Sequence, residues 1–191
     1  MAISEKFKAF YIAYCNFGAL KNILKSRVMR IVLSDELFED LIELVGKNVK
    51  VYEYTFEEMK NNCGLVLVAE NETYFFTITS KMLEDNYSVA TIVLKKFEAK
   101  VLESEQNIEL KTIGKLDNIQ FFTQKHFFNP EGATKVEIVI ECAVLVELSG
   151  GQKYMLIPED DAHQGSKIIT ETDDVLDSIR RVQLSFHRQV L

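Results

Sequence analysis

The sequence of 191 residues is poor in the residues that mark special classes of protein, with no Trp, two Pro, eight Gly and three Cys. So few Pro and Gly residues, beside 47% hydrophobic residues, exclude a disordered, collagen-like or low-complexity chain. Cys15, Cys63 and Cys142 form neither a CxxC pair nor a disulfide framework. No apolar run approaches the roughly 20 residues that span a bilayer, and no cleavable signal pattern is seen. We therefore expect a soluble, globular, cytoplasmic protein.

Signatures of the common enzyme classes are also missing. The sequence has no HExxH, GxSxG, GxGxxG or GxxxxGK[ST] motif, and its three histidines stand in no metal-binding spacing. Cys63 and Cys142 lie in apolar surroundings, which raise the pKa of a thiol and argue against a catalytic cysteine. These absences favour a protein that is not an enzyme and needs no cofactor.

Charge is distributed unevenly along the chain, whose formal net charge is -7. Residues 1–30 contain six basic residues and one acidic residue, so the remaining 161 residues carry a net charge of -12. The densest acidic stretch, 159–177, has seven acidic residues and one lysine. Because an acidic body repels nucleic acid and attracts cationic surfaces, we expect a basic protein as partner.

Hydrophobic periodicity predicts three main helices. Aromatic residues at spacings of three and four predict an N-terminal helix over 5–24. The Ser34 N-cap and the Gly46 stop signal predict a helix over 35–45, between strands at 28–33 and 49–54. Thr172 begins a final helix, whose apolar face extends to Phe186. The aromatic stripe of the first helix consists of Phe7, Phe10, Tyr11, Tyr14 and Phe17.

Alternating apolar residues predict a mostly antiparallel sheet of about eight to nine strands. The clearest strand, 136–148, is expected to turn Glu141 towards solvent. Turns are expected at Gly114 and at 117–118, between two further strands. Together with the helices, this pattern predicts an α+β fold in a single domain, 1–191, with two closely packed halves, about 1–86 and 87–191, as the alternative.

Two groups of residues are candidate partner-binding sites. The first is acidic and lies near the C-terminus, and the second is a pair of aromatic residues in an expected loop before Pro130, where they would form a contact patch. The candidates are Glu159, Asp160, Asp161, Asp173, Asp174, Phe127 and Phe128.

These features favour a non-enzymatic cytoplasmic module that binds and blocks a basic protein, as an immunity protein, an antitoxin-like inhibitor or a phage-defence antagonist would. One alternative is a metal-dependent hydrolase that uses Asp160, Asp161 and His163, because carboxylates and imidazole are ligands of divalent cations. Another is a structural or homo-oligomeric subunit, assembled through the N-terminal helix or an uncovered strand edge.

Overall fold

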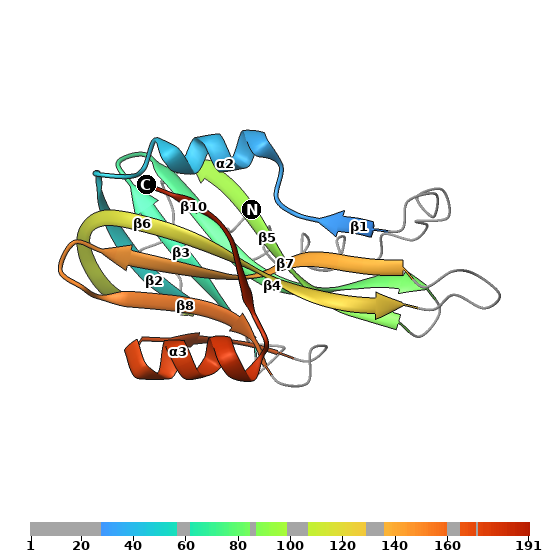
Figure 1. Cartoon of the computed structure of the whole chain (residues 1–191). Helices are drawn as coiled ribbons and strands as arrows, with labels where there is room; N and C mark the ends of the chain where they lie inside the picture. Colours follow the sequence, from blue (N-terminus) through green and yellow to red (C-terminus); the bar gives the residue numbers. More distant parts are fainter. Residues whose placement is uncertain are drawn as a thin grey trace.

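The computed structural model describes residues 28–56, 62–84, 87–98, 107–128, 136–159, 165–170 and 172–191. Within these ranges the chain forms ten strands and two short helices (Figure 1). The helices are α2 (Asp35–Ile42) and α3 (Thr172–Arg181). The strands are β1 (Val28–Ile31), β2 (Asn48–Thr55), β3 (Cys63–Ala69), β4 (Glu72–Glu84), β5 (Tyr87–Glu98), β6 (Ile108–Phe128), β7 (Val136–Leu148), β8 (Lys153–Pro158), β9 (Ser166–Ile169) and β10 (Ser185–Val190).

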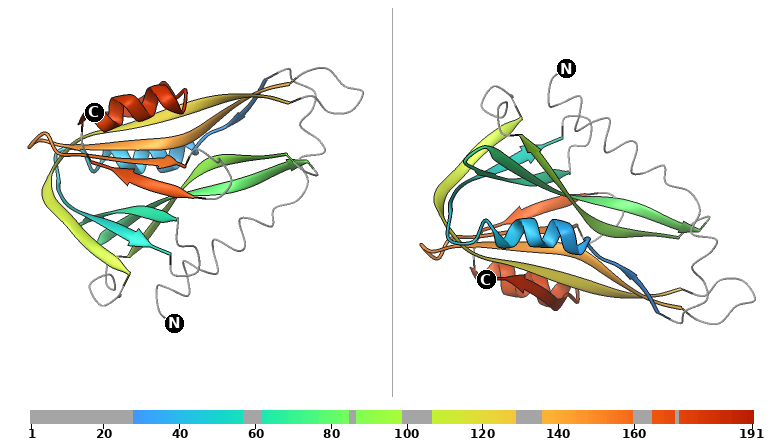
Figure 2. Two further views of the ribbon diagram at one scale, coloured as in Figure 1. Left: turned by 90° about the horizontal axis from the view of Figure 1, so that it is seen from below. Right: turned by 90° about the horizontal axis from the view of Figure 1, so that it is seen from above.

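The prediction of an α+β fold is wrong, because antiparallel strands dominate the part of the chain that the structure describes. Only β1 pairs in parallel there, with β7. The predicted N-terminal helix over 5–24 lies outside the described residues. The predicted final helix is shorter than expected: it ends at Arg181, and Phe186 lies in β10 instead. The fold is a mostly antiparallel β structure in two layers (Figure 2).

The long strand β6 joins the two layers. The first layer has the order β5-β4-β3-β2-β6, and the second continues β6-β7-β8-β9, with β10 on β6 and β1 on β7. Residues 108–115 of β6 pair with β2, and residues 116–128 pair with β7. The turns predicted at Gly114 and at 117–118 are therefore wrong, because the strand passes from one layer to the other there without reversing.

The main hydrophobic core lies between the two layers. Helix α2 packs against it through Leu41, and Leu44, in the turn after the helix, packs there as well. Helix α3 covers the outer face of the second layer, where Val175 packs on β7 and β8 (Figure 2). Strands from both layers contribute to the main core, for example through Val51, Leu65, Phe76, Ile92, Phe121, Val144 and Leu156.

A β-bulge interrupts the alternation of β7. Phe122 of β6 is paired with Ala143, but Thr123 is paired with Glu141, so Cys142 is an extra residue. A bulge redirects the side chains next to it. Glu141 is consequently 0% exposed, and the prediction that it faces solvent is wrong.

Candidate functional site

The most strongly connected polar group in the described chain is the buried carboxylate of Glu141. Arg188 donates from Nε to its Oε1 at 2.7 Å and from Nη2 to its Oε2 at 3.0 Å. The backbone N–H of Leu33 donates to Oε2 at 2.7 Å, and Nδ1 of His187 lies 2.7 Å from Oε1. Four contacts therefore compensate a charge that would otherwise be costly to bury.

A second β-bulge makes this arrangement possible. Phe186 of β10 is paired with Phe122, whereas Arg188 is paired with Phe121, so His187 is an extra residue. Neighbouring residues of a regular strand point to opposite faces. The bulge allows both His187 and Arg188 to reach Glu141.

The guanidinium of Arg188 also lies against aromatic rings. Its central carbon is 4.4 Å from the centroid of Phe38 in α2 and 5.8 Å from that of Phe121 in β6. Its Nη2 donates to the carbonyl of Leu33 at 2.8 Å, and its Nη1 lies 3.5 Å from Asp35. A planar guanidinium suits such stacked and forked contacts. The group connects β10, β7 and the segment between β1 and α2, and this is a structural role.

The two described cysteines are unsuited to nucleophilic chemistry. Burial raises the pKa of Cys63 and of Cys142 to about 12 in each case. Cys63 is tied to β9, because its Sγ donates to the carbonyl of Ser166 at 3.1 Å and its N–H donates to Oγ of Ser166 at 3.1 Å. Since the thiolate is the reactive form, both residues are inert thiols near neutral pH.

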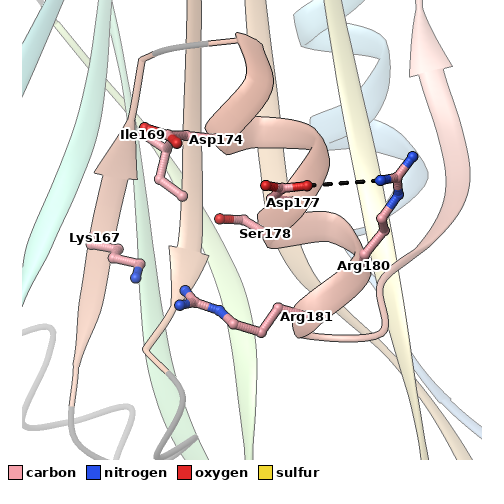
Figure 3. A pocket seen from close by; sticks show the side chains of 7 residues that line it. All are labelled: Lys167, Ile169, Asp174, Asp177, Ser178, Arg180 and Arg181. Atoms are coloured by element: carbon pink, nitrogen blue, oxygen red, sulfur yellow. Dashed lines mark ion pairs between the residues drawn. The ribbon is translucent and has the colours of Figure 1, made fainter.

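The surface of α3 and β9 encloses a hollow of ≈ 750 Å³ (Figure 3). Its side chains are Lys167, Ile169, Asp174, Asp177, Ser178, Arg180 and Arg181. Asp177 lies 3.8 Å from Nη1 of Arg180, and Figure 3 shows Lys167 and Arg181 reaching into the hollow from opposite sides. Acidic residues dominate this stretch of the sequence, but three cations, Lys167, Arg180 and Arg181, line the hollow together with two carboxylates. This surface is therefore of mixed charge.

The structure places only part of the predicted acidic site. Glu159 is half-buried just after β8, and its N–H donates to the carbonyl of Gly165 at 3.0 Å. Asp174 is exposed on α3, and Asp173 belongs to the same helix, although its side chain is not described. The remaining predicted residues of this site and of its metal-binding alternative, Asp160, Asp161 and His163, lie outside the described residues.

The predicted aromatic patch lies in a strand and not in a loop. Phe127 and Phe128 are the last two residues of β6, and Phe127 is 56% exposed. The side chain of Phe128 is not described. Partner contact at this position stays a prediction.

Helix α2 carries an acidic surface that the sequence analysis did not single out. At about 100° per residue, the carboxylates of α2 and of its C-cap residue Glu43 fall on one arc, on the side away from the buried Leu41. This acidic arc consists of Asp35, Glu36, Glu39, Asp40 and Glu43. The sequence signal was available, because the helix has an acidic residue at nearly every position that its apolar face leaves free.

The acidic arc is only partly neutralised. Asp40 lies 3.3 Å from Lys96, and Asp35 lies 3.5 Å from Arg188. Glu36, Glu39 and Glu43 are exposed, and the structure gives none of them an ion pair with another described residue. Within the part of the chain that the structure describes, three of the five carboxylates of the arc are thus exposed without a counter-charge.

Comparison with protein-family models, with curated proteins and with solved structures finds no match to this chain. Within the described ranges, neither helix has the length and apolar character that crossing a membrane requires. The same ranges contain no group of three or more His, Cys, Asp or Glu side chains placed to hold a metal ion. The chemistry of the surfaces is thus the basis for a functional proposal.

Proposed function

We propose that the protein is a non-enzymatic cytoplasmic module that binds a basic protein through the acidic arc of α2 and blocks it, as immunity proteins and antitoxin-like or phage-defence inhibitors do. The observation that carries this proposal is the run of five carboxylates on one face, four in α2 and the fifth at its C-cap residue Glu43. Several charges of one sign on a rigid helix attract a surface of opposite charge over several ångströms, and this attraction raises the rate of association.

Apolar side chains beside the arc supply the second component of a protein interface. Ile42 is 47% exposed at the end of α2, and Val32 is 41% exposed just before the helix. Interfaces combine a dehydrated apolar centre with a polar rim. A basic partner that carries an apolar residue among its cations would therefore match this surface.

The proposal is tested by charge reversal with a matched control. The arc variant Glu36→Lys/Glu39→Lys and the control variant Asp174→Lys/Asp177→Lys change the net charge equally but on different helices. Each purified protein is used for affinity capture from the native lysate at low and high salt, and the captured proteins are quantified by mass spectrometry.

The wild type and the α3 control are expected to retain a basic protein that the arc variant loses by about tenfold or more, with capture weakened by salt. Equal capture by the arc variant and the wild type would show that α2 is not the binding surface. If only the α3 control loses the captured protein, the binding site lies on α3 instead.

A further inference from the structure

The outer face of the first layer is buried. Tyr52, Val66 and Phe75 are paired side by side on β2, β3 and β4, and each is at most 6% exposed. Tyr54 and Phe56 extend the cluster, with ring centroids 4.9 Å apart, and the rings of Tyr54 and Phe75 are 5.7 Å apart. These five aromatic and apolar side chains form the outer cluster.

This cluster points away from the core. Its neighbours along the strands, such as Val51, Leu65 and Phe76, belong to the core between the layers, and alternate residues of a strand face opposite sides. Neither described helix lies over the outer cluster, because α2 packs on the central core and α3 on the second layer (Figure 2).

Two polar residues on the same face are buried as well. Thr73 and Thr77 flank Phe75 at alternate positions of β4, and each is 2% exposed. Their hydroxyl groups have no hydrogen-bond partner among the described residues. Hydroxyls on an open strand face are hydrated, so their burial indicates that a further segment of the same chain covers this surface.

We infer that the outer face of the first layer is the docking surface of the chain's own residues 1–27. No other stretch outside the described residues exceeds eight residues, whereas this one has 27. A 20-residue helix, as predicted over 5–24, is about 30 Å long, enough to cross several strands. Its predicted aromatic stripe matches an aromatic surface, where rings stack or meet edge to face.

The consequence is that the basic N-terminal segment is held on the body by an apolar contact. It is then not a free cationic arm for nucleic acid or membranes. This inference does not depend on the proposed function, because it concerns a different face and a different set of side chains.

Thiol labelling of the full chain tests the inference. Thr77→Cys places a reporter under the expected cover, in a chain whose Cys15→Ser change removes the cysteine of the N-terminal segment. A charged aromatic disulfide is the reagent. Two variants are compared. The stripe variant is Phe10→Glu/Tyr14→Glu, and the control is Ala9→Glu/Ile12→Glu, on the opposite side of the predicted helix.

The reporter is expected to react slowly in the parent and in the control, and at least about tenfold faster in the stripe variant. Cys63 and Cys142, which are buried in the body, should stay unlabelled throughout and so show that the fold persists. Rapid labelling in the parent would show that the face is open. Unchanged protection in the stripe variant would show that another segment covers it. Either result would overturn the inference.

If the reagent labels Cys63 and Cys142 as well as the reporter in the stripe variant, that variant has unfolded. A second experiment with milder substitutions then tests the inference. Tyr14→Ala and Val66→Ala are combined in a double-mutant cycle measured by urea unfolding. Residues in contact should depart from additivity by about twofold or more in the unfolding equilibrium constant. Additive effects would overturn the inference, as would coupling of the same size between Tyr14→Ala and Leu184→Ala on the second layer.

Discussion

Arg188, near the C-terminal end of the chain, donates two hydrogen bonds to the carboxylate of Glu141, from Nε to Oε1 at 2.7 Å and from Nη2 to Oε2 at 3.0 Å. The two residues are 47 positions apart and lie on strands that are both paired with β6. Glu141 has no exposed surface. An ion pair whose carboxylate is shielded from water therefore holds the last strand, β10, on the second layer.

Replacing Arg188 with Ala should destabilise the protein by about 3–5 kcal/mol, because it leaves a buried carboxylate without its main counter-charge. Arg188→Lys should be intermediate, since one ammonium group cannot make both forked contacts. Urea unfolding followed by circular dichroism measures both. Arg180→Ala is the control, because its pair with Asp177 is about four-fifths exposed on both sides and contributes little. If Arg188→Ala were no more damaging than this control, the pair would not hold the strand.

Removing both charges should be less damaging than removing one. Glu141→Leu alone leaves Arg188 unpaired, and Arg188→Leu alone leaves Glu141 unpaired, whereas the double variant leaves neither. The double variant should recover about 1–4 kcal/mol relative to the worse single variant in the same unfolding assay, because burying apolar groups removes the desolvation cost. Simple additivity of the two losses would contradict this, and would mean that other contacts stabilise each group.

The two β-bulges explain why the contacts between Glu141, His187 and Arg188 could not be predicted from the sequence. Local signals were sufficient for the start of α2, where Oγ of Ser34 accepts from the N–H of Leu37. The predicted end at residue 45 is wrong, because the helix ends at Ile42 and Glu43 is its C-cap, while Gly46, with a positive φ of 83°, lies in the turn that follows. By contrast, the burial of Glu141 depends on the pairing of β7 with β6. Simple alternation placed it outside, since no local pattern marks Cys142 as an extra residue.

The continuation of β6 from the first layer into the second could not be predicted from the sequence for a related reason. Gly114 and the pair at 117–118 have turn chemistry, which predicts a reversal. Whether a chain reverses or continues there depends on partners far away in sequence: Val49 of β2 is paired with Gly114, and Leu148 of β7 is paired with Leu116. The α2 arc is different, since helical geometry alone would have revealed it.

Gly64→Ala should destabilise the first layer, because a Cβ at this position would lie 2.4 Å from Cε2 of Phe75 and 3.0 Å from the backbone oxygen of Phe76. The ring can move only at the expense of its packing, so we expect a loss of about 1–3 kcal/mol. Chemical unfolding measures it. The control is Gly150→Ala, where the nearest atom beyond the adjacent residues is Oε1 of Gln152, 3.9 Å from the added Cβ. If the two variants were equally stable, the ring of Phe75 would be able to move away from the added Cβ without loss of packing energy.

Stability should fall between pH 9 and pH 12 because of Cys63 and Cys142. Burial raises the pKa of each thiol from 9.0 to about 12, so in this range the unfolded chain releases protons that the folded chain keeps. Since the folded state then binds more protons, the free energy of unfolding decreases as pH rises, by at most about 1.4 kcal/mol per pH unit for each thiol.

The double variant Cys63→Ala/Cys142→Ala removes this source of pH dependence. The free energy of unfolding should therefore fall less steeply in the variant than in the wild type, and the two slopes should agree below pH 8, where thiols are protonated in both states. Urea titrations at pH 7, 8, 9 and 10 measure the slopes. Tyr74, whose pKa is also raised to about 12, contributes equally to both proteins and cancels in the comparison. Parallel slopes above pH 9 would show that the folded chain ionises its thiols as readily as the unfolded chain, which the burial of both side chains opposes.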